Sequence, residues 1–568
     1  MTEYAAGNES EHVSEWPLRP WVLAGLLGFA GLMIWVCAGD EGPDTTVGWQ
    51  AAAAAFFFFG GISLAFTLER DRWKELVAFA GMAGLVMAGL AWRSVGAAGA
   101  IPSPDYGMLA GAVATALALP LFQAGFHRTR WATPYARIHH TVWTDAICFA
   151  GSMAFVGASW LLLVLLSELF HLLEIDLLRD LIGQAWFGWT WSGTAFGAAL
   201  GVLRNEIGIL STLKRVVMTV LSILAVPLAA GLAIFLGAMV VSGPDVLWQA
   251  TRNATPILLL CAAGAWVLAN AILRDDDADM SGNRLLRLAA LVLVVIVLPL
   301  TVFAAVSLGT RIAQHGLSPE RLWGIIAIAV ATAYGLAWFV AVVRSWRSDA
   351  WRDNVRRANL HLAVGISVVA LFLALPIIDF GAIAARNQVA RLEAGKVSAD
   401  EFDYAALRWD FGNAGRRALA KLEGSANPDV ARLAREARRQ TQRIWPGTPV
   451  PAKVDLRIQP ANPELEKQVR DWLRANPWGC SERCVVLDLG PAAGGKRRVA
   501  IVTGPGYQTV DLPSDGAVVG TKQAAEVELK ADSKVEVRTL PRRYITVDGV
   551  PIGQPLDDSR VEAPRPPR

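Results

Sequence analysis

Residues 286–308 read LRLAALVLVVIVLPLTVFAAVSL, and Arg287 is the only charged residue among them. A helix needs about 20 mostly apolar residues to cross the hydrocarbon core of a bilayer, so this stretch predicts a transmembrane helix. The same criterion, carried outward in both directions, predicts about eleven spans in all. The others are 21–38, 47–68, 75–92, 106–126, 144–167, 182–203, 216–241, 256–273, 322–343 and 358–379.

The composition agrees with lipid as the solvent of most of the chain. Of 568 residues, 54% are hydrophobic and only 18% are charged, and the mean hydropathy is +0.37. Soluble chains carry about 25% charged residues. A net charge of +3 is too small to indicate a nucleic-acid partner. The lipid bilayer is therefore the first partner that the sequence predicts.

Lysine and arginine collect in alternate connections between the spans. Arg70, Arg72 and Lys74 follow the second span, whereas connection 39–46 holds no basic residue. Basic residues are retained on the cytoplasmic side of a membrane. The alternation predicts a cytoplasmic N-terminal tail at 1–20 and an exoplasmic part beyond residue 380. The tail has acidic residues where a signal peptide needs basic ones, which predicts that the first span is retained.

The predicted fold class is mainly α: a polytopic transmembrane helix bundle at 21–380, then a soluble helical segment and a small α+β domain. The part of the chain beyond residue 380 divides into four segments by composition and residue pattern. Its predicted segments are short helices at 381–445, a proline-rich linker at 446–452, the α+β domain at 453–556 and a disordered tail at 557–568.

Local signals refine this polar part. Ser398 and Glu401 form a capping-box pattern before a helix at 402–409. In the α+β domain, Asp548-Gly549 predicts a hairpin turn, and residues 463–475 predict a helix. Alternating residues predict strands at 454–458, 484–489, 498–503, 507–512, 525–530 and 534–540.

Ionisable residues within or beside the spans are candidates for function. His139, His140 and Asp145 stand at the start of the fifth span, and Asp379 ends the last. The histidines and Asp145 could relay protons or bind a metal. They could equally form an interfacial segment that meets the headgroups. Adjacent histidines point in different directions on a helix, so the pattern predicts no metal site and no cofactor.

Small residues and prolines mark the spans where helices pack or bend. Gly193, Gly197 and Gly201 form a tandem GxxxG ridge, which predicts close approach to another helix, within the bundle or between subunits. The oligomeric state stays open. Prolines interrupt several spans. They are tolerated where neighbouring groups satisfy the freed backbone carbonyls, or they mark broken helices that line a substrate path. They are Pro120, Pro227, Pro299 and Pro376.

Two features of the α+β domain resemble functional motifs. Cys480 and Cys484 are four residues apart in a part predicted to be exoplasmic, which favours a disulfide. No further zinc ligands stand near them. Residues 490–496 nearly spell a phosphate-binding loop. Arg497 stands where Ser or Thr is required, so a hairpin loop is the better interpretation.

Four stretches resemble bacterial multi-pass proteins of the domain-of-unknown-function 4153 family. They are Gly316–Trp323, Leu375–Gly381, Gln388–Gly395 and Phe402–Phe411, and the resemblance covers approximately 130–425. It implies a bacterial cytoplasmic membrane protein with its C-terminal domain in the periplasm. It implies no accepted activity, so no catalytic residue is carried over.

The sequence leaves three classes of function open. The preferred prediction is a non-enzymatic protein of the bacterial cell envelope whose exoplasmic domain binds a partner protein or a ligand. The alternative is a transporter or channel for a small solute through the proline-kinked helices. The third class is a membrane enzyme for lipid-linked substrates, with His139, His140 and Asp145 as its only candidate residues.

Overall fold

The computed structural model describes two compact units of the chain, Met1–Arg435 and Glu436–Arg568. The described residues are 16–40, 45–70, 72–96, 99–243, 254–280, 282–345, 348–440, 443, 455–475, 479–480, 483–492, 496–503, 506–512, 518–523, 545–547 and 550–552. The predicted linker 446–452, the tail 557–568, the strands 525–530 and 534–540 and the turn Asp548-Gly549 lie outside them.

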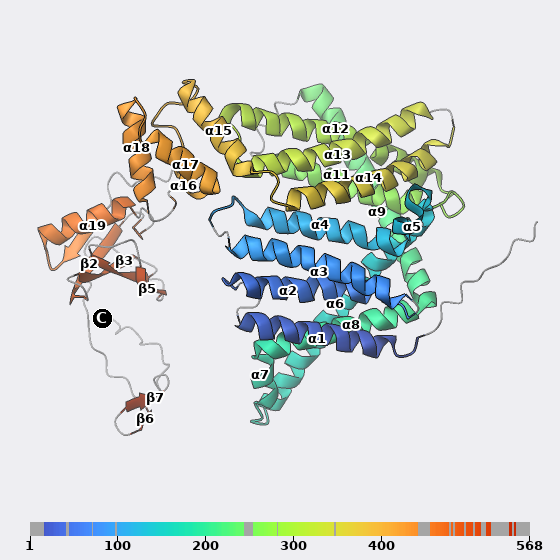
Figure 1. The fold of residues 1–568 in the computed structure, drawn as a ribbon, viewed down its shortest axis with the longest axis horizontal. Coiled ribbons are helices and arrows are strands. Elements are labelled where there is room, and N and C mark those ends of the chain that lie inside the picture. Colours follow the sequence, from blue (N-terminus) through green and yellow to red (C-terminus); the bar gives the residue numbers. More distant parts are fainter. Residues whose placement is uncertain are drawn as a thin grey trace, which may run out of the picture. The chain divides into compact units, whose positions relative to one another are not determined.

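The first unit is a bundle of long helices (Figure 1). Its helices are α1 (Arg19–Ala38), α2 (Gly48–Thr67), α3 (Trp73–Gly96), α4 (Pro104–Gln123), α5 (Phe126–Thr129), α6 (Tyr135–His171), α7 (Leu177–Ile182), α8 (Ala185–Asn205), α9 (Ile207–Ser242), α11 (Ala254–Leu273), α12 (Arg284–His315), α13 (Pro319–Arg344) and α14 (Trp351–Ala374). A short 3₁₀ turn, Arg130–Ala132, precedes α6.

Among the described residues, ten helices are long and apolar enough to cross a membrane. The sequence predicts about eleven, and the difference is 182–203, which corresponds to α8. Serine, threonine and glycine lower the hydropathy of α8. It nevertheless lies antiparallel beside α1, because Gly193 faces Leu27 whereas Gly201 faces Pro20.

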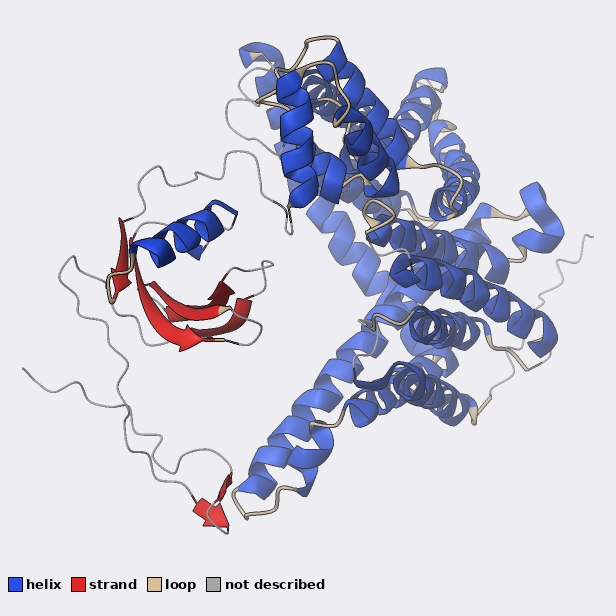
Figure 2. Ribbon diagram, turned by 60° about the vertical axis from the view of Figure 1, so that its left-hand side comes forward, coloured by secondary structure: helices blue, strands red, loops and turns tan. Residues whose placement is uncertain are grey.

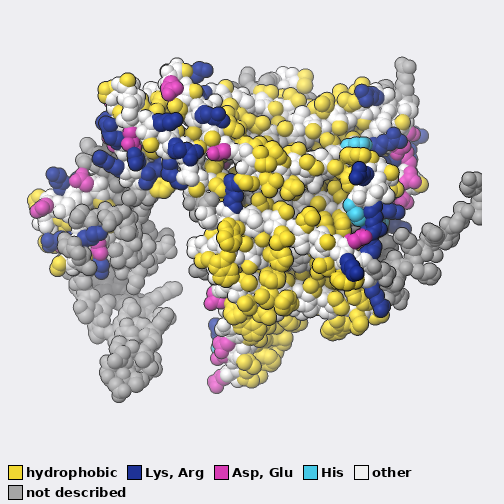
Figure 3. Space-filling model, viewed as in Figure 1, with side chains coloured by type: hydrophobic (Ala, Val, Ile, Leu, Met, Phe, Trp, Pro, Cys, Tyr) yellow, Lys and Arg dark blue, Asp and Glu magenta, His cyan; other side chains and the backbone are white. Residues whose placement is uncertain are grey.

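Apolar side chains cover the outside of the bundle between its two ends (Figure 3). On α9, Ile234, Val240 and Val241 are 72%, 83% and 87% exposed. Such surfaces are costly in water but are normal against lipid chains. The exposed apolar surface therefore supports the assignment of the first unit as a multi-pass membrane protein.

Hydrogen bonds identify the two ends of the bundle. At the end where α1 begins, Arg19 donates to the carbonyl of Arg204 (2.9 Å), and Gln123 at the end of α4 donates to that of Phe66 (3.2 Å). We call this the N-terminal end. At the other end, Tyr106 near the start of α4 stacks on Trp323 near the start of α13, with ring centroids 5.5 Å apart.

Four shorter helices follow α14 at that second end, which we call the α15 end. They are α15 (Phe380–Glu393), α16 (Tyr404–Trp409), α17 (Gly412–Leu422) and α18 (Pro428–Arg439). Half of the capping box forms, since Ser398 Oγ accepts from the Glu401 amide (3.3 Å), while the Glu401 carboxylate accepts from the Ser398 hydroxyl (3.0 Å). The helix nevertheless begins later than predicted, because Asp403 caps α16 by accepting from the Ala406 amide (2.9 Å).

The second unit holds a five-stranded sheet in the order β1-β2-β3-β4-β5 and a separate two-stranded pair, β6 and β7. Its elements are β1 (Asp455–Gln459), α19 (Pro463–Ala475), β2 (Arg483–Pro491), β3 (Arg497–Thr503), β4 (Gly506–Leu512), β5 (Val518–Gln523), β6 (Ile545–Val547) and β7 (Val550–Ile552). Strands β1 and β2 are parallel and the rest pair antiparallel. Figure 2 shows α19 beside the sheet, and Val469 and Trp472 of this helix pack into its core.

Candidate functional site

Helix α15 is fastened to the turn between α12 and α13. Asn387 Oδ1 accepts from the Leu317 amide (2.9 Å), and Gln388 Nε2 donates to the carbonyls of His315 (2.8 Å) and Leu317 (2.9 Å). Arg391 donates to two further carbonyls in the last turn of α12, at 3.0 and 2.7 Å. These bonds satisfy the carbonyls that a helix end leaves unpaired. Helix α15 is therefore held on the bundle.

Helix α17 is fastened to the connection between α3 and α4. The Asn413 amide donates to the Ala100 carbonyl (2.8 Å). Gly412 has a φ of +60°, and a Cβ atom there would overlap the Ala100 carbonyl. Only glycine fits both the backbone conformation and the space at this position. The extramembrane helices thus contact the bundle at two separate places.

A groove of about 840 Å³ lies among α15, α17, the start of α18 and the 395–399 connection. Its floor is apolar and includes Val389, Leu392 and Leu422. Arg386, Arg417 and Lys421 line it as exposed cations, and Glu393 is the one exposed carboxylate among the lining residues. We call this the basic groove. Figure 3 shows Lys and Arg side chains gathered over α15–α17.

A smaller pocket of about 230 Å³ lies at the α15 end, between the ends of α3 and α14 and the loop before α4. Arg93, Ser94, Ser103 and Asp379 supply its polar lining, and Trp323 forms an aromatic wall. Asp379 also caps α15 by accepting from the Ala382 amide (2.9 Å). We call this the interfacial pocket, because aromatic residues of this kind mark membrane–water interfaces.

The structure does not bring the histidines and Asp145 together as a site. His139 is buried at 5% exposure between the rings of Tyr135 and Trp143, with centroids 5.7 and 6.2 Å away. His140 is exposed on another side of α6. Asp145 has Arg204 and Gln123 as its polar neighbours. Among the described residues, no group of three or more His, Cys, Asp or Glu could hold a metal.

Gly193, Gly197 and Gly201 face α1. Cβ atoms there would overlap the backbone of Leu27, Leu23 and Pro20, respectively. The two helix backbones therefore touch, as small residues allow in membrane helices. Within the described chain this contact lies inside one bundle.

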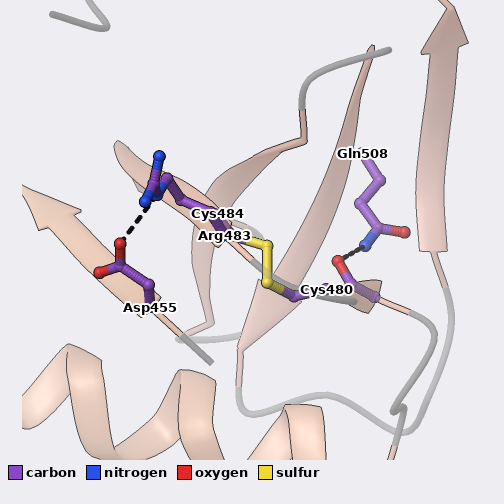
Figure 4. The surroundings of a disulfide bond; sticks show 6 residues. Asp455, Cys480, Arg483, Cys484 and Gln508 are labelled. Carbon is purple, nitrogen blue, oxygen red and sulfur yellow. Dashed lines mark hydrogen bonds and ion pairs between the residues drawn. A yellow bond between two sulfur atoms is a disulfide. The ribbon is translucent and has the colours of Figure 1, made fainter. Parts of the chain in front are cut away.

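Cys480 and Cys484 form a disulfide, with Cα atoms 6.0 Å apart (Figure 4). Both residues are buried in the core of the second unit. Beside the bridge, Gln508 Nε2 donates to the Gly479 carbonyl (3.0 Å). Arg483 pairs with Asp455 across β1 and β2 (2.8 Å). The bridge thus joins the segment before β2 to the sheet.

The sequence reasoning missed a buried polar network at the N-terminal end. Trp338 Nε1 donates to Asn359 Oδ1 (2.9 Å), and Asn359 Nδ2 donates to Asn270 Oδ1 (2.7 Å). Asn359 also lies 3.3 Å from the Tyr135 hydroxyl, so the network joins four helices. Asparagines inside otherwise apolar spans were the sequence feature that could have indicated this network, because such residues form hydrogen bonds between membrane helices.

Next to this network, α14 is held by ion pairs. Arg356 donates to Asp277 (2.7 Å), to Asp353 (2.7 Å) and to the Leu273 carbonyl (2.7 Å). Arg352 also pairs with Asp277 (2.6 Å). Both arginines therefore join α14 to the connection after α11.

The comparisons with known proteins identify the family. Residues 56–422 match the model described as domain of unknown function DUF4153, and the chain belongs to this family. The match begins earlier than the predicted 130 and ends close to the predicted 425. No curated protein and no solved structure matches the chain.

Proposed function

We propose that this DUF4153 member is a non-enzymatic membrane protein that binds an acidic segment of a partner protein in the basic groove. The groove itself carries the proposal. It is large, its floor is apolar, and three exposed cations oppose one carboxylate around it. An apolar floor supplies affinity, while the charges select and orient an acidic partner.

The attachment of α15 and α17 supports this assignment. Both helices are held on the bundle by hydrogen bonds from Gln388, Arg391 and Asn413. A preformed groove loses less conformational entropy on binding than a flexible one. A partner bound there would be held against the membrane by these same contacts.

The proposed location is the bacterial inner membrane, with the N-terminus in the cytoplasm and the groove and C-terminal domain in the periplasm. The alternation of basic connections supports this orientation. The helix contacts are consistent with this orientation, because α1 begins at the N-terminal end of the bundle whereas α15 lies at the opposite end. Periplasmic conditions also permit the Cys480–Cys484 disulfide.

Site-specific photo-crosslinking in cells tests the proposal. A photoreactive amino acid at position 418, where Ala418 lines the groove, is expected to give a discrete crosslinked product. The same amino acid in place of the exposed Ala420 on the same helix is the matched control and is expected to give none. Reversing two groove charges with Arg417→Glu and Lys421→Glu is expected to remove the product.

A charge reversal next to the groove separates groove binding from general electrostatics. Arg416 neighbours Arg417 but bonds Asn413 (2.7 Å) and does not line the groove, so Arg416→Glu is expected to keep the product. Equal crosslinking from positions 418 and 420 would contradict the proposal. So would failure of Ala420→Cys to react with a membrane-impermeant thiol reagent in cells whose outer membrane is permeabilised.

A further inference from the structure

The interfacial pocket has a polar lining and adjoins two mainly apolar grooves, each of which has one carboxylate in its lining, Glu320 or Asp105. One groove, of about 420 Å³, lies among α4, α13 and α14 and shares Trp323 and Leu373 with the pocket. The other, of about 350 Å³, is lined by α1–α4 and α8 and shares Ser94 and Met108 with it. A polar pocket beside apolar grooves is complementary to an amphiphile rather than to a water-soluble ligand.

The grooves face the hydrocarbon region. Leu109 and Val369 line the first and are 59% and 44% exposed, and Phe58 lines the second at 44%. Around the pocket itself, Trp323 contacts Tyr106 and Phe380, with ring centroids 5.5 and 5.0 Å away. Trp and Tyr concentrate at the depth of the headgroups. The pocket therefore lies where a headgroup would enter and the grooves lie where acyl chains would run.

The charges of the pocket indicate which headgroup fits. Arg93 is half-buried in its wall and makes no hydrogen bond or ion pair with any residue that the structure describes. Asp379 is exposed there and uses Oδ1 to cap α15, which leaves Oδ2 for a ligand. One cation and one anion in the same pocket complement a headgroup that carries both charges. Ser94 and Ser103 add hydroxyl donors for phosphate oxygens.

We infer that the interfacial pocket binds a phospholipid with a phosphate and an ammonium in its headgroup, of the phosphatidylethanolamine type. Arg93 binds the phosphate, Asp379 binds the ammonium, and the acyl chains occupy the two grooves. The pocket's 230 Å³ is more than ten times the ~10–15 Å³ that holds one water molecule, so it has room for a group of several heavy atoms. This site is separate from the basic groove and does not depend on the proposed partner.

Native mass spectrometry of the full-length protein tests the lipid site. Protein purified in detergent is mixed with equal amounts of phosphatidylethanolamine and phosphatidylglycerol. The wild type is expected to retain the first in preference. Arg93→Gln is expected to lower retention of both lipids about tenfold, because a charge-assisted bond to phosphate is lost. Asp379→Asn keeps the helix cap and is expected to remove the preference for the ammonium headgroup.

Arg179→Gln is the matched control, because Arg179 is an exposed arginine on α7, away from the pocket. It is expected to retain lipid as the wild type does, and all variants should elute as monodisperse protein. Phosphatidylethanolamine with a photoreactive acyl chain should label peptides of α4 and α14 in the wild type and less in Arg93→Gln. Equal retention of the two lipids by the wild type, or equal retention by Arg93→Gln and Arg179→Gln, would overturn the inference.

Discussion

Arginines that form ion pairs are buried in the helix bundle and exposed in the C-terminal sheet. In the bundle, Arg352 and Arg356 are 9% and 5% exposed and join α14 to the connection after α11 through Asp277. In the sheet the burial is reversed: Arg497 and Arg498 are 50% and 43% exposed, whereas their partners Asp488 and Asp511, on neighbouring strands, are 8% and 20% exposed. Loss of a buried guanidinium leaves the acceptors around it without a donor, whereas water replaces much of what an exposed guanidinium supplies.

The same distinction applies to contacts without charge. Where α1 meets α8, glycines bring the two backbones together and leave no room for another atom. Neither water nor lipid can substitute for such a contact. The comparison therefore predicts that the bundle is sensitive to single changes at its closed contacts, and that the sheet tolerates the loss of its surface charges.

The largest effect is expected for Gly197→Val. Its side chain would overlap the Leu23 backbone, which cannot move aside as a flexible side chain can. Overpacking of this kind costs about 3 kcal/mol. The midpoint of thermal unfolding in detergent should fall markedly. Gly25→Val on α1 is the control, because nothing lies within 4 Å of a Cβ atom there, and its midpoint should stay near that of the wild type.

A second, intermediate effect is expected for Arg356→Ala. The substitution removes the donors to Asp277 and to the buried Leu273 carbonyl. We expect a loss of about 2 kcal/mol, because Arg352 still pairs with Asp277 and limits the damage. The adjacent Arg357 is exposed, so Arg357→Ala is the control for loss of one positive charge in the same turn. Equal midpoints for these two variants would show that burial does not decide the effect.

The sequence predicts where the apolar helices lie better than how long they are or which helices they contact. Hydropathy marks 286–308 and 358–379 as apolar because it averages over a window. It does not reveal that α1 lies against α8 rather than only against α2. The GxxxG ridge indicates that Gly197 meets some helix, but Leu23 is far from it in sequence.

The candidate sites were harder to predict for the same reason. Arg93 and Asp379 line one pocket although they stand at the ends of different spans. Asp379 lies in one of the family-like stretches, Leu375–Gly381, but no local motif surrounds Arg93. The basic groove combines residues of α15 and α17 that are separated by a turn whose path the sequence does not specify. By contrast, Cys480 and Cys484 are close in sequence, so their spacing and the predicted exoplasmic location were enough to predict the disulfide.

The smallest effect is expected in the sheet, for Asp511→Asn. The hydrogen bond from Arg498 holds the pKa of Asp511 below its ordinary value, and Arg497 does the same for the pKa of Asp488. A carboxyl whose folded-state pKa is lowered stabilises the protein at pH values above its unfolded-state pKa, about 3.9. It loses that contribution as the pH falls through the folded-state pKa.

Hydrogen exchange of β3 and β4 peptides, compared between wild type and variant at each pH, measures the contribution locally. The difference should be small at pH 7, smaller still in high salt, and absent at pH values well below 3.9, where the wild type is also protonated. A difference that grows as the pH falls would mean that Asp511 acts through something other than its ion pair.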